Sequence, residues 1–270
     1  MENSAPIIEI NLSENINDVI ARSPIPFKPD CLAAAGVCWY EISRSPNNKE
    51  LPIASIKTGA HTLLLKNAFR ISTAIFDRDG SQIESIEITL RGLPDDSLHE
   101  DSQEALYQLI NGLQRAGWTH YYHRSDPRIS GKEMDKINTP EKVLGKLVFS
   151  HPWLAPNYKI DLKRWLEIGL FYDWYFFNEH SYLHLRALHS PSRAAPKERG
   201  TYLVTLTFST EAEFWKIPFQ GEDKLHWKEL LPDELAISKK RREALEAKAR
   251  AAGIEVDELY QDPLIRALNL

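Results

Sequence analysis

The chain has 270 residues, of which 43% are hydrophobic, 26% charged and 10% aromatic, a composition typical of a folded protein with one large or two modest domains. Its formal net charge of −5 predicts no general attraction to nucleic acid or to an anionic membrane. No apolar run approaches the roughly 20 residues that span a bilayer, so we expect no membrane span.

The first part of the chain, residues 1–58, is rich in proline and favours irregular structure, with one strand predicted over residues 37–42. Cys31 and Cys38 lie seven residues apart. Their Cα atoms would be about 10 Å apart in a helix, so a disulfide requires the chain to fold back at the intervening LAAAG. We therefore expect two small, buried apolar residues.

A β-hairpin is the next predicted element. Residues 71–76 and 86–90 each alternate apolar and polar side chains, and Asp79-Gly80 between them is a strong turn signal. The pattern predicts two antiparallel strands joined by a turn at these two residues.

A helix is expected after the hairpin. Ser97 and Glu100 match a capping box, with Ser97 as the N-cap. Apolar residues then recur at helical spacing from Leu106 to Leu113, and Gly117 is a natural residue for the end of the helix. The order strand, strand, helix, strand favours an α+β fold in which the helix packs on an antiparallel sheet.

The elbow, which we define as residues 117–131 (GWTHYYHRSDPRISG), follows the helix. We expect a short strand and then a corner at Asp126-Pro127, tied by charge-assisted hydrogen bonds of Arg128. The alternative is a partner-binding surface, because exposed Tyr, Trp and Arg dominate interface energetics. The candidate partner-binding residues are Trp118, Tyr121, Tyr122, His123, Arg124, Asp126 and Arg128, with Glu179 and His180 of a later turn.

The remainder of the chain predicts a second strand-rich part and a helical tail. TPEKVLGKL favours a short helix capped by Thr139. Alternating residues over 174–189 predict a hairpin with a tight turn near Asn178-Glu179, and those over 202–208 predict a further strand. Residues 232–252 favour a charged helix that stops at Gly253. We expect its basic run, Lys239 to Arg242, to be a solvated face.

This organisation predicts two antiparallel-sheet-containing halves with packed helices and a helical C-terminal tail. The boundaries are residues 1–135 for the first half, 136–230 for the second half and 231–270 for the tail.

One stretch resembles a catalytic motif. AIFDRDGSQI (residues 74–83) is similar to the first motif of haloacid-dehalogenase-type phosphatases, a resemblance that implies Asp77 as nucleophile, Asp79 as the proton-transferring residue and a bound magnesium ion. Ser81 stands where that family has threonine, and the following residues continue as a strand where the family has a loop and helices. We therefore expect an exposed turn and no catalytic residues, with the phosphatase as an alternative.

Metal and cofactor motifs are not recognisable in the sequence. His120 and His123 would lie on opposite faces of a strand, and His180 and His184 would be about 13 Å apart on one, too far to share one zinc ion. We expect no metal and no cofactor.

Two stretches resemble a group of bacterial proteins that are encoded near type VI secretion effectors. The first is RGLPDDSLHEDSQEALYQLINGLQRAGWTHYYHRSDPRISG and the second is WYFFNEHSYLHLRALH with the following YLVTLTFS. They share the glycine-tryptophan helix exit, the Asp-Pro-Arg corner and the aromatic hairpin, over about residues 70–210.

The resemblance implies an immunity protein, which neutralises a cognate toxin by direct binding. Such relatives usually carry a leader, whereas the N-terminus, MENSAPIIEINLSEN, lacks the basic start and apolar region of one. We expect a periplasmic location if a leader has been removed and a cytoplasmic location otherwise. The alternative is an adaptor that loads effectors and docks through its tail helix. In that case removal of residues 233–270 should leave the strand-rich body folded.

Overall fold

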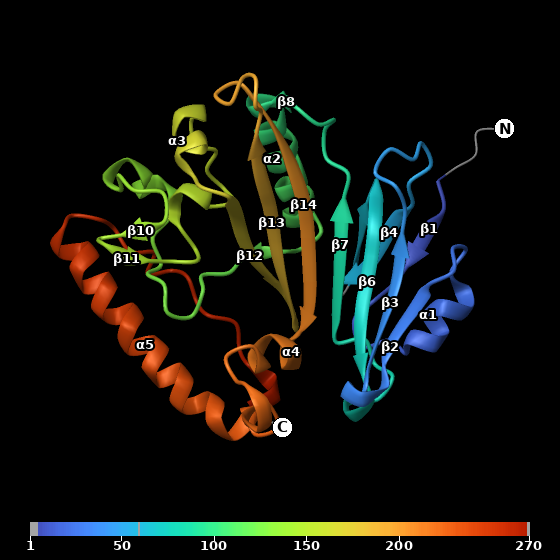
Figure 1. Cartoon of the computed structure of the whole chain (residues 1–270). Coiled ribbons are helices and arrows are strands. Elements are labelled where there is room, and N and C mark those ends of the chain that lie inside the picture. Colours follow the sequence, from blue (N-terminus) through green and yellow to red (C-terminus); the bar gives the residue numbers. More distant parts are fainter. Residues whose placement is uncertain (1–4, 59, 269–270) are drawn as a thin grey trace.

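The computed structural model describes residues 5–58 and 60–268 and has the predicted α+β fold (Figure 1). The α-helices are α1 (Ile16–Arg22), α2 (His99–Arg115), α3 (Leu162–Glu167), α4 (Glu211–Lys216) and α5 (Trp227–Ala251). The strands are β1 (Ile7–Glu9), β2 (Lys28–Leu32), β3 (Val37–Ser43), β4 (Ile53–Thr58), β5 (His61–Leu65), β6 (Ala68–Phe76), β7 (Ser85–Leu90), β8 (Ser97–Leu98), β9 (Thr119–His120), β10 (Lys142–Val143), β11 (Lys146–Leu147), β12 (Phe171–Asn178), β13 (Ser181–Pro191) and β14 (Arg199–Thr210). Short 3₁₀ helices include η1 (Ala33–Ala35), η2 (Asp77–Asp79), η3 (Gly131–Lys136), η4 (Pro152–Leu154), η5 (Gly221–Lys224) and η6 (Arg266–Leu268).

A nine-stranded sheet forms the body of the protein, with the strand order β2-β3-β6-β7-β14-β13-β12-β9 and β8 paired beside β14. All its neighbouring strands run antiparallel. The predicted hairpins β6–β7 and β12–β13 are both present, and β14 pairs with β7 so that Leu206 lies opposite Ile88. Strands from both predicted halves are thus hydrogen-bonded into one sheet, and the division at residue 135 stays a prediction.

The main core lies on one face of this sheet. Along β14, Val204, Leu206 and Phe208 are buried there, whereas Thr205 and Thr207 on the opposite face are half-buried. This alternation is the one that the sequence predicts for a sheet with one covered face. The covering layer consists of α2 and a three-stranded sheet with the order β1-β4-β5, whose apolar residues share one cluster with those of the large sheet (Figure 1).

Helix α2 ends as predicted but begins later than predicted. The N–H of Gly117 (φ +86°) donates to Gln114 O at 3.0 Å, and the N–H of Trp118 donates to Leu113 O at 3.1 Å, which is a Schellman ending. The predicted N-cap, Ser97, lies instead in β8 opposite Gly200, and its hydroxyl donates to Pro94 O. The capping-box prediction is therefore wrong, because pairing with β14 holds this residue in the sheet.

The β6–β7 connection is longer than a two-residue turn. Residues 77–84 form it, starting with η2, and the segment that precedes α1 holds it in place. Ile83 N donates to Glu14 O at 2.9 Å and Ile16 N donates to Ser81 O at 2.9 Å. The hairpin prediction is confirmed, but the tight turn at Asp79-Gly80 is wrong because these tertiary hydrogen bonds stabilise a wider loop.

The two cysteines are bridged, contrary to expectation. β2 and β3 form a hairpin that places Cys31 directly opposite Cys38, and the chain folds back through η1 and Gly36 (φ +59°). The folding back at LAAAG that a disulfide requires is therefore present. Neither cysteine is buried, since Cys31 is exposed and Cys38 half-buried.

The segment TPEKVLGKL is a small hairpin, not the predicted helix. β10 and β11 pair across Leu144-Gly145, and both of these residues have positive φ (48° and 80°). Positive φ at both turn residues suits a two-residue hairpin. The threonine and proline at the start of the segment indicated a helix start and gave no sign of this turn. The hydroxyl of Thr139 donates to Lys142 O and so does not cap a helix.

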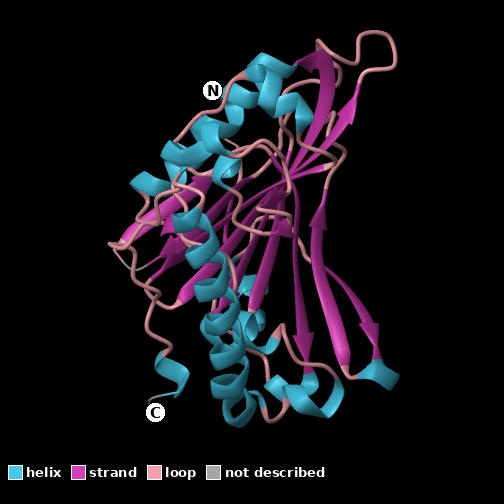
Figure 2. Cartoon of the chain, turned by 90° about the vertical axis from the view of Figure 1, so that its left-hand side faces the viewer, coloured by secondary structure: helices cyan, strands magenta, loops and turns pink. Residues whose placement is uncertain are grey.

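Helix α5 runs past the edge of the sheet formed by β9 and β12, and the last residues return along it (Figures 1 and 2). It begins five residues before the predicted start and contains Pro232, and Gly253 (φ +73°) follows it as predicted. Arg242 is only 6% exposed, so the basic run is not wholly solvated. The described residues contain no helix that is long and apolar enough to cross a bilayer.

The tail packs against the body, which argues against the expectation that the body stays folded when residues 233–270 are removed. Leu235 and Ile265 of the tail pack against the aromatic cluster of Tyr121 and Trp215. Ala249 (0% exposed) belongs to an aliphatic cluster with Ile129. Removing residues 233–270 would uncover both clusters, so the body is not expected to keep its stability. The adaptor hypothesis itself stays a prediction.

Candidate functional site

The elbow is buried or half-buried at every residue except Thr119. Trp118 and Tyr121 are each 1% exposed, Tyr122 is 4% exposed and Asp126 is 2% exposed. The expectation that these four residues are exposed is wrong, and their role in binding a partner stays a prediction. The short strand β9 joins the edge of β12, Trp118 packs in the main core, and helices α4 and α5 cover the ring of Tyr121.

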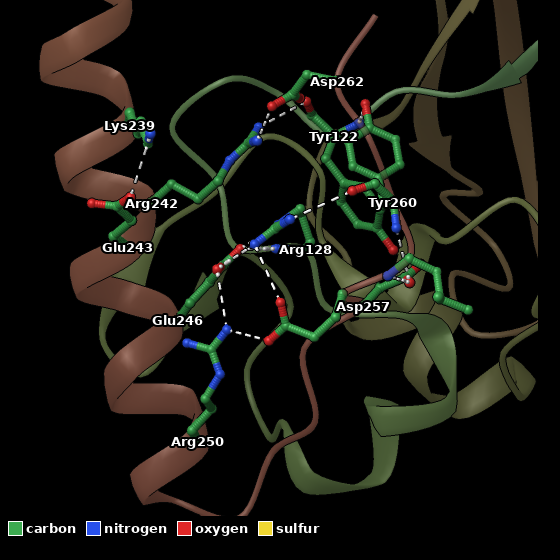
Figure 3. Close-up of polar contacts among 12 residues, drawn as sticks. Tyr122, Arg128, Lys239, Arg242, Glu243, Glu246, Arg250, Asp257, Tyr260 and Asp262 are labelled. Carbon is green, nitrogen blue, oxygen red and sulfur yellow. Dashed lines mark hydrogen bonds and ion pairs between the residues drawn. The ribbon is translucent and has the colours of Figure 1, made fainter.

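Arg128 joins the elbow to α5 through a nearly buried carboxylate (Figure 3). Its Nε and Nη2 atoms donate to the two oxygens of Glu246, each at 2.8 Å, and its backbone N donates to the same carboxylate at 3.1 Å. Glu246 is 2% exposed, so burial raises its pKa, but the hydrogen bonds from Arg128 outweigh burial and the net pKa lies below its ordinary value. Arg128 therefore acts as the predicted tie of the corner.

Arg242 of α5 makes a second tie, to the elbow and to the C-terminal segment (Figure 3). Its Nη1 donates to Asp262 at 2.5 Å and its Nη2 donates to His123 O at 3.0 Å. Next to it, the rings of Tyr122 and Tyr260 pack edge to face at 4.8 Å. The elbow, α5 and the tail thus form one structural clasp, and the predicted structural role of the elbow is the one that its contacts support.

Asp126 and Arg124 hold further parts of this clasp. The Asp126 carboxylate accepts hydrogen bonds from the N–H groups of Phe149 and Ser150, both at 2.7 Å. Burial raises the pKa of Asp126 to about 6, although these two hydrogen bonds act in the opposite direction. Arg124 pairs with Glu234 of α5 at 3.2 Å.

Three of the predicted residues meet elsewhere, in a cavity of about 560 Å³ that we call the strand-end pocket. It lies where the β12–β13 turn and the end of β14 approach β4 of the small sheet. Trp118, Glu179 and His180 line it, together with Leu12, Ser13, Ile56, Lys57, Glu84, Asn178, Ser181, Phe208, Thr210, Glu211, Ala212, Arg266 and Ala267.

An apolar side and an unpaired donor characterise this pocket. The indole of Trp118 packs edge to face on Phe208 with ring centroids 5.5 Å apart. Its Nε1–H is buried and donates to no acceptor within the described residues. A buried donor without a partner is costly, so a local rearrangement that brought an acceptor to this N–H would gain free energy.

Several polar residues of the pocket come from the β12–β13 turn, from the start of α4 and from the last described residues of the chain. Arg266 Nη1 donates to His180 Nε2 at 2.7 Å, since a guanidinium can only donate. The carboxylate of Glu211 accepts the backbone N–H groups of Arg266 (3.2 Å) and Ala267 (2.7 Å). Glu179 is exposed on the turn with φ +50°, so the pocket combines an apolar part with charges of both signs.

The sequence did not indicate the other residues of the pocket. Lys57, Glu84 and Arg266 come from distant parts of the chain, and no motif connects them. Arg266 belongs to the tail, which was predicted as a part of the chain separate from the two strand-rich halves. The aromatic residues of the elbow did point to Trp118, but the reason given, that its side chain is exposed, was wrong.

The structure gives the phosphatase motif a different context from the one that the resemblance implies. β6, which precedes Asp77, runs antiparallel to both of its neighbours, β3 and β7. Asp77 is exposed, and its N–H donates to Gly36 O at 2.9 Å. The side chain of Asp79 lies outside the described part of the structure. Among the side chains that the structure does describe, no three from His, Cys, Asp and Glu are placed to hold a metal ion together.

Comparison with known protein families, with characterised proteins and with solved structures finds no match for this chain.

Proposed function

We propose that this chain is a non-catalytic binding protein, and that it acts as an immunity protein that neutralises a cognate secreted toxin by direct binding. The observation that carries the proposal is the strand-end pocket, which is lined by apolar residues, by charged ones and by Trp118, whose indole N–H is buried without a partner among the described residues. A desolvated aromatic anchor surrounded by polar groups is the usual anatomy of a protein-binding hot spot.

The exposed turn at the pocket supports a protein partner. Glu179 and His180 are both exposed and project from the β12–β13 turn, where they can contact a surface that covers the pocket. Charges at such a position mainly set the association rate and the choice of partner. The indole N–H of Trp118 would donate to a carbonyl or carboxylate oxygen of the partner, which would supply its missing acceptor.

The disulfide between Cys31 and Cys38 supports the periplasmic alternative for the location. Disulfides persist in oxidising compartments such as the bacterial periplasm and are rare in the cytosol. The periplasm is also where an immunity protein would meet a toxin that acts on the cell envelope.

The test uses as the probe the protein encoded by the gene adjacent to the gene of this chain. The chain should bind it and should protect cells against it and not against unrelated toxins. Trp118→Phe removes the N–H and keeps an aromatic ring, so affinity should fall about fivefold, the equivalent of one net hydrogen bond. The matched control is Trp174→Phe, because Trp174 Nε1 is also buried without a partner but does not line the strand-end pocket.

The two variants lose the same ring volume, so both should be destabilised to a similar degree while only Trp118→Phe weakens binding. Equal affinities of the two variants would remove the strand-end pocket from the proposal. Absence of both binding and protection would refute the immunity function itself.

A further inference from the structure

A second cavity, which we call the β5–α2 groove, lies between the edge of the small sheet and helix α2. Its volume is about 620 Å³. Leu64 and Leu65 of β5 form one wall, Ala105 and Leu109 of α2 line the other, and Val204 of β14 lies between them. Leu64 is 53% exposed. The groove is separate from the strand-end pocket, and the two share no lining residue.

The edge of β5 that faces this groove is an open strand edge. β5 pairs only with β4, and no hydrogen bond joins the backbone of β5 to any other element that the structure describes. In an antiparallel pair, alternate residues direct their N–H and C=O groups away from the partner strand. These groups of β5 are therefore available to another strand.

β5 also lacks the residues that normally protect a strand edge. At the edge of the large sheet, β2 (KPDCL) carries Lys28, Pro29 and Asp30, which discourage pairing. β5 (HTLLL) contains no proline and no Lys, Arg, Asp or Glu, and its leucines provide apolar surface along the groove. A leucine-rich open edge is a template for the addition of a strand.

The charged residues of the groove are both cations. Lys66 and Arg91 line it, and no aspartate or glutamate does. Arg91 donates to the carbonyl oxygens of Pro46 and Asn48, each at 3.2 Å, and to Asn67 Oδ1 at 3.4 Å. Lys66 is exposed and forms no ion pair with any residue that the structure describes. Neither cation is matched by a carboxylate, so the groove is complementary to an acidic side chain.

We propose that the β5–α2 groove binds an extended segment of another protein, which adds as a strand to the free edge of β5 and places a carboxylate side chain against Lys66 and Arg91. A strand of β5's five residues spans about 17 Å at about 3.4 Å per residue. Main-chain hydrogen bonds supply the affinity, and the leucine walls and the two cations select alternating apolar and acidic residues. The inference is independent of the partner at the strand-end pocket.

The experiment selects random dodecamer peptides, displayed on phage, against the immobilised full-length chain. Enriched peptides should alternate apolar residues with Asp or Glu. A synthetic copy of the most enriched peptide should slow hydrogen exchange of the β5 amides. Leu64→Glu and Lys66→Glu should each lower its affinity about tenfold, since each opposes an acidic ligand at an exposed position.

Matched controls make the same changes elsewhere on the surface. Leu225→Glu replaces a leucine that is 64% exposed, and Lys239→Glu replaces a lysine whose side chain is 75% exposed. Both should leave peptide affinity within about twofold. The inference is overturned if no peptide is enriched, or if the groove variants bind as tightly as their controls. The inference is also overturned if peptide binding leaves the hydrogen exchange of the β5 amides unchanged. It is overturned as well if the chain dimerises without peptide and the dimer protects these amides.

Discussion

The salt bridge between Arg128 and Glu246 provides the most direct test of the clasp between the elbow and α5. Arg128→Ala removes two hydrogen bonds of 2.8 Å and leaves the Glu246 carboxylate, 2% exposed, with the backbone N–H of residue 128 at 3.1 Å and Arg250 at 3.6 Å. Removing one partner of a buried pair costs about 3 kcal/mol or more, and the lower figure applies because Arg250 and the backbone N–H still compensate part of the remaining charge. We expect the free energy of unfolding to fall by about this amount.

Urea unfolding at pH 7, followed by tryptophan fluorescence and by circular dichroism, measures this loss. The double variant Arg128→Met/Glu246→Leu should be more stable than Arg128→Ala, because it leaves no buried charge without its partner. Lys239→Ala is the control, since its pair with Glu243 is 3.9 Å long and exposed on both sides, and it should cost less than about 1 kcal/mol.

Acid provides an independent check of the same contact. The folded pKa of Glu246 lies below its unfolded value, so the pair stabilises the protein above the unfolded pKa of about 4.3, and this stabilisation is lost as pH falls through the folded pKa. The difference between wild type and Arg128→Ala should therefore shrink in acid. A loss at pH 7 no larger than that of Lys239→Ala would refute the reasoning.

Three further predictions concern acid, the helix ending and the disulfide. Burial lowers the pKa of both His151 and His189 to about 4, so the fold loses about 3 kcal/mol at each histidine as pH falls from above the unfolded pKa of about 6.5 to pH 4. Protonation of Asp126, whose pKa is raised to about 6, returns about 2 kcal/mol over the same range, so pH-dependent urea unfolding should show a net loss. Gly117→Ala should lower the free energy of unfolding by about 2 kcal/mol, because φ is +86° and the added Cβ would lie 3.0 Å from Asn178 Nδ2; thermal unfolding measures this loss. Cys31→Ser should destabilise the protein by about 2 kcal/mol through the lost cross-link, and reductant should lower the Tm of the wild type but not of this variant.

Regular strands were predicted well because their signal is local. β12, β13 and β14 alternate buried and partly exposed residues with a period of two, and a sheet with one covered face leaves this pattern in the sequence. Gly117 and Gly253 were correctly placed after helices because the left-handed conformation they adopt favours glycine. The errors occurred where distant segments decided the local structure. β8 formed where a capping box was expected, since β14 holds it in the sheet.

The candidate site could be predicted only in part, for a related reason. An aromatic stretch such as the elbow indicates either burial or binding and does not distinguish the two. Tyr121 is buried because α4 and α5, which come about 90 residues or more later in the chain, cover it. The strand-end pocket required β4, the β12–β13 turn and the chain end to meet. No local pattern encodes such a meeting.

The sequence by itself determined the α+β class, the two long hairpins and the ends of α2 and α5, because backbone preference and alternation of side chains act over a few neighbouring residues. Tertiary structure alone decided that the elbow is a buried clasp, that Cys31 meets Cys38, and that β5 keeps a free edge beside α2. Burial, cross-strand pairing and an open edge are properties of the space around a residue, and that space is filled by segments far away in the chain.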